Sequence, residues 1–266
     1  MKKLISLLIS LLVISTLSAC TSSNAKVIKV GASPAPHAEI LELIKPLLAE
    51  KGYTLEIVEF TDYVLPNTTL QEGDLDANYF QHVPYLEYFN ENNGTTLVSV
   101  LAVHFEPLGL YPGKSSTIES IPDGATIAVP NDATNEHRAL NLLASLGWIT
   151  LDPAVTEGAT VQNIIANPKN LTIVEIVAEN LVNTLQDVDY AVINGNYALE
   201  ADITDNVLVT EDKDSVAAQT YANILAVKAG NEDDAKTKAL IEALSSDEVK
   251  TFIEETYYPV VISVLP

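Results

Sequence analysis

The chain has 266 residues, of which 36 are Asp or Glu and only 14 are Lys or Arg, so that its net charge is −22. This balance argues against a nucleic-acid partner, because phosphate binding needs a basic surface. The single cysteine excludes a disulfide framework and any paired-cysteine zinc or redox site, whereas 47% hydrophobic residues are enough to form a folded core.

The N-terminus has the pattern of a secretory signal. Two lysines precede an apolar run from Leu4 to Leu17, which is shorter than the roughly 20 residues that a membrane-spanning helix needs. The following Leu17-Ser18-Ala19-Cys20 resembles a bacterial lipobox, whose cysteine receives a diacylglycerol after cleavage just before it. A lone buried cysteine is the alternative. We predict a signal peptide over residues 1–19, lipidation of Cys20 and a tether over residues 20–26.

Beyond the tether, short β-rich runs alternate with helical patterns. The first series predicts strands over residues 27–32, 55–60, 76–80 and 95–103, and helices over residues 36–52, 66–72 and 83–92. We expect Pro46 to kink or split the first of these helices, because proline has no backbone N–H to donate inside a helix.

A second series begins after Gly113. It predicts strands over residues 126–129, 171–177, 188–193 and 221–227, and helices over residues 131–146 and 160–167, before two acidic C-terminal helices. Asn131-Asp132 offers an N-cap to the helix that Gly147 ends. The alternation indicates an α/β protein with largely parallel sheets.

Two such series indicate two lobes of common domain size, joined by extended segments over residues 106–112 and 221–227. We assign residues 27–110 and 225–266 to the first lobe and residues 111–224 to the second. In folds of this kind, ligands bind in a cleft at the strand ends.

Arginine occurs once, at Arg138, in the second turn of the helix that Asp132 is expected to cap. A guanidinium group matches a carboxylate with two parallel donors and stays charged when it is buried. Arg138 is therefore a candidate for binding an anionic ligand. On residue counting alone, an intramolecular ion pair with one of the 36 carboxylates is the more frequent alternative.

Several segments in a fixed order resemble the methionine-binding lipoproteins of ABC importers, the NlpA/MetQ type. The resemblance runs from about Val27 to Val227 and is carried by Gly31-Ala32-Ser33-Pro34, Asp62–Asn67, Asp76–His82, Pro130–Asp132 with Thr134-Asn135, Asn167–Leu171, Ala191–Ala198 and Tyr221-Ala222-Asn223.

The resemblance implies a two-lobe α/β fold of the type II periplasmic-binding-protein kind, with a ligand cleft between the lobes. It implies that Arg138 holds the carboxylate of an amino acid and that Asn194 and Asn223 bond its other polar groups. It implies that the pocket for the ligand's side chain is lined by Tyr63, Phe80 and His82. Tyr221 is implied to lie beside these three residues. No catalytic residue, metal ligand or cofactor is implied.

His137 stands where the family usually has glycine, which predicts a titratable ring beside Arg138. The sequence therefore leaves the preferred ligand open among L-methionine, D-methionine, a methionyl peptide and another apolar amino acid. The resemblance further implies a monomer, held at the extracytoplasmic face of the cell membrane by its lipid, that delivers its ligand to a permease driven by an ATPase.

Two other functions compete with this interpretation. A metal-binding lipoprotein would use His37, His82, His104 and His137, but these have no local ligand spacing. A secreted enzyme lacks a nucleophile elbow, a zinc-protease motif and a phosphate loop, although paired carboxylates are possible in so acidic a chain.

Overall fold

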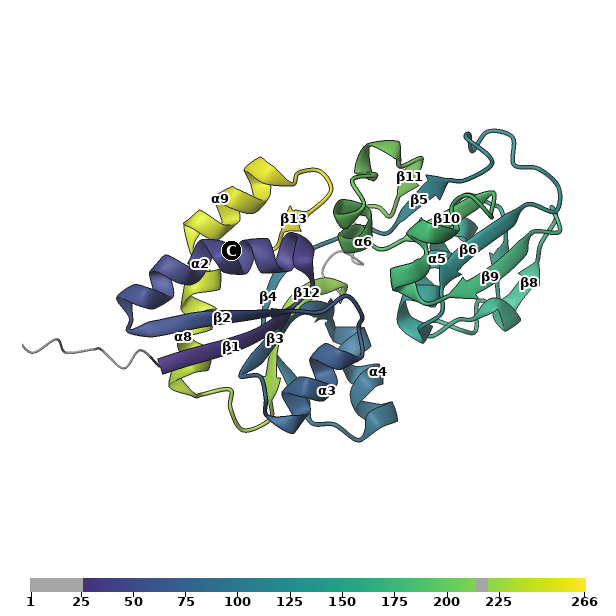
Figure 1. Cartoon of the computed structure of the whole chain (residues 1–266). Coiled ribbons are helices and arrows are strands. Elements are labelled where there is room, and N and C mark those ends of the chain that lie inside the picture. Colours follow the sequence, from purple (N-terminus) through teal and green to yellow (C-terminus); the bar gives the residue numbers. More distant parts are fainter. Residues whose placement is uncertain (1–25, 214–219) are drawn as a thin grey trace, which may run out of the picture.

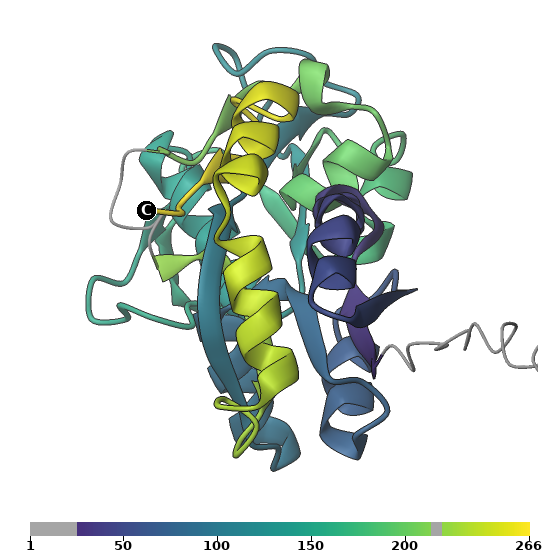
Figure 2. The ribbon, with the colours of Figure 1, turned by 90° about the vertical axis from the view of Figure 1, so that its left-hand side faces the viewer.

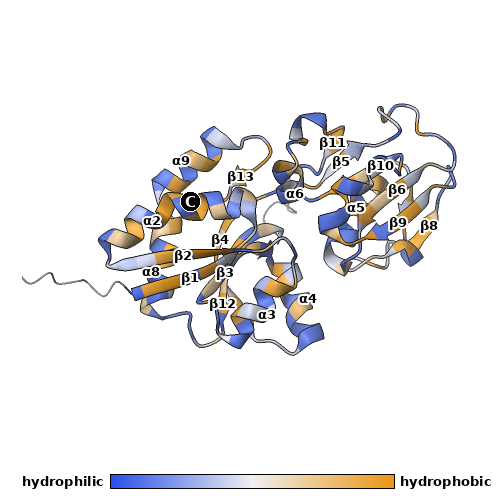
Figure 3. Cartoon of the chain, viewed as in Figure 1, coloured by the Kyte–Doolittle hydropathy of each residue, from blue (hydrophilic) through white to orange (hydrophobic). Residues whose placement is uncertain are grey.

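The computed structural model describes residues 26–213 and 220–266, which form two mixed β-sheets with helices on their faces (Figure 1). The predicted signal peptide, the lipidation site Cys20 and all of the tether except Lys26 lie outside the described residues. Hydrophobic residues are concentrated on the strands of both sheets (Figure 3). Within the described part of the chain, no helix has the length and apolar character needed to cross a membrane.

The first sheet has the strand order β13-β4-β12-β3-β1-β2. Strand β1 is parallel to β2 and β3, whereas β12 is antiparallel to both β3 and β4. The bounds are β1 (Lys26–Ala32), β2 (Tyr53–Glu59), β3 (Ala77–His82), β4 (Leu97–Phe105), β12 (Ala222–Lys228) and β13 (Ile262–Ser263).

Helices cover both faces of this sheet, because successive side chains of a strand point to opposite faces and pack in two separate cores. Leu225 and Val227 of β12 pack in one core with α2 (Glu39–Glu50), α8 (Ala235–Leu244) and α9 (Asp247–Thr256), which lie on the same side of the sheet (Figure 2). Ile224 and Ala226 face the other side and pack with α3 (Leu65–Glu72) and α4 (Val83–Asn93). A π-helical turn (Pro34–Ala38) leads into α2.

The second sheet has the order β11-β5-β10-β6-β9, with β6 parallel to β9 and β10 and with β5 antiparallel to β10 and β11. Helix α5 (Ala133–Ser145) packs on one face, and α6 (Gly195–Glu200) packs on the other. The strands are β5 (Gly109–Pro112), β6 (Thr126–Pro130), β9 (Thr172–Ile176), β10 (Tyr190–Ile193) and β11 (Val209–Thr210).

Smaller elements complete this half of the molecule. Strands β7 (Thr150–Leu151) and β8 (Ile164–Ala166) form a separate antiparallel pair. Single 3₁₀ turns lie at Val161–Asn163, Ala178–Asn180, Val182–Thr184 and Thr204–Asn206. The link between the two sheets is short, since β4 ends at Phe105 and β5 begins at Gly109.

Most elements lie where the sequence predicts them, and the predicted N-cap of α5 is confirmed by the bond from the Asn135 N–H to Asp132 Oδ1 (2.9 Å). Two predictions are wrong. The sheets are mixed rather than largely parallel, because the chain re-enters the first sheet along β12 in the opposite direction to β3. Residues 160–167 form a 3₁₀ turn and strand β8 instead of a helix.

Pro46 neither splits nor ends α2, which continues to Glu50. Pro46 is exposed, and so is Glu42, whose carbonyl would accept the missing backbone bond. Water can therefore satisfy that carbonyl, so that the helix tolerates the proline.

Candidate ligand-binding site

A small cavity is lined by residues of both sheets and their helices. Six of the seven predicted ligand residues line it. The seventh, Tyr221, packs against His82 and Arg138, which do line the cavity. The complete lining is Tyr63, Phe80, Gln81, His82, Tyr85, Glu106, Asn135, Arg138, Asn194, Gly195, Asn196 and Asn223.

His82 lies at the end of β3, where it also caps α4. Its Nδ1 accepts a bond from the Tyr85 N–H (3.2 Å), so that the proton is on Nε2, which donates to Asn135 Oδ1 (3.2 Å). Burial, together with the nearby charge of Arg138, lowers the pKa of His82 to about 3. His82 is therefore neutral at physiological pH and joins the first sheet to α5.

Aromatic rings form one wall of the cavity. The ring centroids of Tyr63 and Phe80 are 5.8 Å apart, and Tyr85 lies 5.9 Å from Tyr63 and 6.2 Å from Phe80. The Tyr63 hydroxyl donates to Asn196 Oδ1 (2.5 Å), which links this wall to α6. Such a wall suits an apolar or thioether side chain, because sulfur–aromatic contacts contribute about 0.3–1.5 kcal/mol.

Arg138 is buried and forms the intramolecular ion pair that was the alternative to ligand binding. Its Nε and Nη2 donate to the two carboxylate oxygens of Glu211 (3.1 and 2.6 Å), and Nη2 also donates to the Glu106 carbonyl (3.0 Å). Nη1 donates to Asn135 Oδ1 (3.2 Å), and the ring of Tyr221 lies 4.6 Å from Cζ.

These contacts use four of the five guanidinium N–H groups. The fifth, on Nη1, has no partner among the described residues, and Arg138 lines the cavity. Because Glu211 occupies the two-pronged edge, Arg138 can offer a ligand one N–H and a partly balanced charge rather than a bidentate clamp.

Two asparagines present complementary groups. Asn194 Oδ1 is buried without a hydrogen-bond partner among the described residues. Asn223 Oδ1 lies 3.0 Å from His37 Nε2, which must donate because a carbonyl oxygen only accepts. The Asn223 NH₂ group therefore remains as a donor at the cavity. An unpartnered acceptor and free donors around one cavity match a ligand that has both an ammonium and a carboxylate group.

Comparison with known proteins decides the family. The sequence model of the NlpA lipoprotein family matches residues 28–265. The chain belongs to the NlpA lipoprotein family.

Similar proteins and solved structures match most of the chain. The methionine-binding lipoprotein MetQ of Bacillus subtilis is 41% identical over 99% of both chains. The crystal structure of a lipoprotein from Ruminococcus gnavus is 52% identical, covers 90% of this chain and 99% of its own, and has a TM-score of 0.88. A nutrient-binding protein from Burkholderia cenocepacia bound to methionine is 41% identical, with a TM-score of 0.84 over 89% of this chain and 99% of its own.

His137 does not line the cavity that Arg138 lines, so that the predicted titratable ring beside the Arg138 guanidinium is wrong. Its Nδ1 accepts from the Ala159 N–H (3.2 Å), and its Nε2 lies 3.0 Å from the side-chain amide of Asn141. The ring lines a separate surface groove. Consecutive helical residues point about 100° apart, which separates His137 from Arg138.

We expect His137→Ala to leave ligand affinity within about twofold of the wild type. The free energy of unfolding should fall by about 1–3 kcal/mol, because the Ala159 N–H loses its partner. Isothermal titration calorimetry and urea denaturation measure the two effects. A tenfold change in affinity at unchanged stability would contradict this placement.

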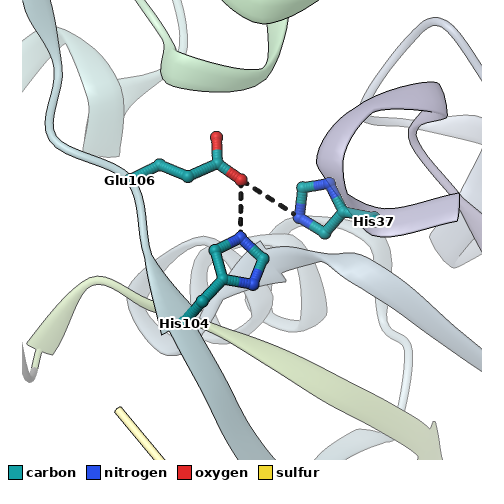
Figure 4. Close-up of side chains that lie close together, drawn as sticks. All are labelled: His37, His104 and Glu106. Atoms are coloured by element: carbon teal, nitrogen blue, oxygen red, sulfur yellow. Dashed lines mark hydrogen bonds and ion pairs between the residues drawn. The ribbon is translucent and has the colours of Figure 1, made fainter. Parts of the chain in front are cut away.

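The four histidines of the metal-site alternative do not converge. Of the described residues, only His37, His104 and Glu106 form a group with metal-ligand geometry, within 4.8 Å of one another (Figure 4). Glu106 Oε1 accepts from His104 Nε2 (2.7 Å) and lies 3.4 Å from His37 Nε2, which donates to Asn223 Oδ1 (3.0 Å). The four-histidine site is therefore wrong, and the group is a hydrogen-bonded network that also contacts Asn223.

Sequence reasoning missed several lining residues. Asn135 and Asn196 lie inside segments that carried the family resemblance, and Tyr85 lies one helical turn after His82, so that spacing could have suggested all three. Glu106 lies in the predicted crossover, which is where a residue can contact both lobes. Glu211 has no local signal, because it is 73 residues from Arg138.

Proposed function

We propose that this protein is the substrate-binding lipoprotein of an ABC amino-acid importer, that it binds methionine or a close relative, and that it has no catalytic activity. Two groups at a cavity with an aromatic wall carry this proposal: Asn194 Oδ1 and one N–H of Arg138, neither of which has a partner among residues 26–213 and 220–266. The names of the Bacillus subtilis relative and of the methionine-bound Burkholderia structure support the choice of ligand.

Each part of the ligand then has a partner. Arg138 and the Asn223 NH₂ group bind the carboxylate, and Asn194 Oδ1 accepts from the ammonium. Tyr63 and Phe80 surround the thioether. A zwitterion that enters a closed cavity loses its water, so that unmade bonds would cost about 1–3 kcal/mol each.

Ligand contacts from both sheets stabilise the closed arrangement of the two lobes. The contacts that already join them, Tyr63 to Asn196 and His82 to Asn135, persist only when the lobes are close. A ligand that binds both lobes therefore shifts the population toward the closed form, which docks on the permease and its ATPase.

Calorimetry of ligand-stripped protein tests the binding function. We expect one molecule of L-methionine to bind per protein. Titrations with D-methionine, Gly-Met and the other apolar amino acids then compare their affinities with that of L-methionine. Mass spectrometry of the ligand that co-purifies with untreated protein gives an independent identification. The proposal is wrong if neither methionine nor any related amino acid binds.

We further propose that the protein is a monomer, with residues 27–110 and 225–266 as one lobe and residues 111–224 as the other. The distribution of the strands between two sheets supports two lobes, although β5 (Gly109–Pro112) begins two residues before the proposed first boundary and β12 (Ala222–Lys228) begins three residues before the second. The lipobox-like sequence supports attachment to the extracytoplasmic face of the cell membrane through Cys20, since two or more buried acyl chains anchor a protein stably.

The variant Cys20→Ala should move the protein from the membrane fraction to the soluble fraction. Methionine affinity should stay unchanged, because Cys20 is not among the residues that line the cavity. Fractionation followed by immunoblotting measures the first effect, and calorimetry of the released protein measures the second. Retention of the variant in the membrane fraction would argue against a lipid anchor.

A further inference from the structure

Glu106 is a buried carboxylate in the short link between the two sheets, and it lines the ligand cavity. Of the residues that form this lining, it is the only one with a carboxylate, and Arg138 is the only one with a permanent positive charge. The cavity therefore contains one acidic and one basic group, the charge pattern that a zwitterion requires.

One oxygen of the Glu106 carboxylate is hydrogen-bonded by a neutral histidine and lies near a second. Oε1 lies 2.7 Å from His104 Nε2 and 3.4 Å from His37 Nε2 (Figure 4). The other ring nitrogen of His104 faces the Tyr79 hydroxyl. Burial lowers the pKa of His37 to about 4 and that of His104 to about 3, so that both rings are neutral: His104 orients the carboxylate, His37 donates to Asn223, and neither ring balances the charge of Glu106.

The other oxygen, Oε2, points away from both histidines and toward the start of α6 (Figure 4). A Cβ atom on Gly195 would lie 3.0 Å from Oε2 and 2.9 Å from Glu106 Cβ, so that only glycine allows this approach. The residue before Gly195 is Asn194, whose Oδ1 lacks a partner among the described residues. Glu106 and Asn194 thus both border the N-terminus of α6, where the Asn196 backbone N–H also donates to the Glu106 carboxylate.

The charge of Glu106 is not balanced within the described part of the chain. Arg138 forms its bidentate pair with Glu211 and contacts only the backbone carbonyl of Glu106. No lysine or arginine of residues 26–213 and 220–266 forms an ion pair with the Glu106 carboxylate. Burial raises the pKa of Glu106, which is the cost that a cation beside it would offset.

We propose that Glu106, together with Asn194, recognises the α-ammonium group of the ligand and thereby selects amino acids over the corresponding carboxylic acids. This inference rests on the proposed amino-acid binding. The ligand would lie with its ammonium toward Glu106 and its carboxylate toward Arg138, so that positive and negative groups alternate through the site.

Comparison of L-methionine with its deaminated analogue, 4-(methylthio)butanoic acid, tests this role. Wild-type protein should bind methionine about 30-fold or more tightly than the analogue. The variant Glu106→Gln keeps the shape of the side chain but removes its charge. We expect the variant to lose most of this preference, because its affinity for methionine falls while its affinity for the analogue stays the same or rises.

Glu211→Gln is the matched control, since Glu211 is a second mostly buried carboxylate that pairs with Arg138 and does not line the cavity. It should change the affinities for both ligands by a similar factor, because both carry the carboxylate. Circular dichroism and thermal unfolding establish that each variant is folded.

The outcomes separate the two proposals. If wild-type protein binds no amino acid, the proposed function fails. If it binds methionine and the analogue equally well, the role of Glu106 is wrong whatever the variants do, including a variant that does not fold. If Glu106→Gln weakens both ligands by the same factor, Glu106 only positions the site and the ammonium assignment is wrong.

Discussion

Alanine in place of Arg138 should weaken methionine binding by about 100-fold or more. The substitution removes the cationic partner of the ligand carboxylate in a buried site, where the loss of one member of a charged pair costs about 2–5 kcal/mol. It also removes the N–H groups that donate hydrogen bonds to Glu211 and Asn135. Isothermal titration calorimetry of ligand-stripped protein measures the change.

The free energy of unfolding should fall as well, because a mostly buried Glu211 carboxylate would remain without a counter-charge. The double variant Arg138→Ala with Glu211→Ala separates the two effects. It should recover part of the lost stability, since the unpaired carboxylate is gone, but it should not recover binding. Near-native methionine affinity in either variant would contradict the assignment of Arg138 as the carboxylate partner.

Phe80→Ala should have the second largest effect. Phe80 is buried in a cluster with Tyr85 and Phe89, and truncation of a buried phenylalanine costs about 3–5 kcal/mol of unfolding free energy. Because Phe80 also forms part of the cavity wall, we expect methionine affinity to fall about tenfold or more. Urea denaturation and calorimetry measure the two quantities.

Phe89→Ala is the matched control, because Phe89 belongs to the same buried cluster but does not line the cavity. The two variants should lose similar amounts of stability, whereas only Phe80→Ala should lose affinity beyond that caused by destabilisation. If both variants lose the same affinity, the wall contributes through the stability of the fold and not through direct contact with the ligand.

Local sequence patterns predicted the elements that local forces determine. Helix α5 begins at its Asp132 cap, and Gly94 ends α4 in the left-handed conformation that glycine favours. Residues 160–167 were mispredicted because their helical pattern is overridden by the pairing of β8 with β7. The direction of β12 also escaped prediction, since a strand's own sequence does not determine the direction of its neighbours.

The candidate site divides in the same way. The family resemblance identified Tyr63, Phe80, His82, Arg138, Asn194 and Asn223, and all six side chains line one cavity. Their roles toward a ligand remain predictions. Glu106 was missed because a single glutamate among 36 acidic residues has no distinguishing pattern until its burial and its two histidine neighbours are known.

The sequence alone determined the family resemblance, the lipobox-like N-terminus and the side chains available for an amino-acid ligand, because these depend on residue identity and short spacings. The tertiary structure decided which donors of Arg138 are free and where His137 points. It also decided which carboxylate lies in the cavity. These depend on contacts such as the one between Arg138 and Glu211, 73 residues apart, which form only when the two sheets and the chain returning between them are folded together.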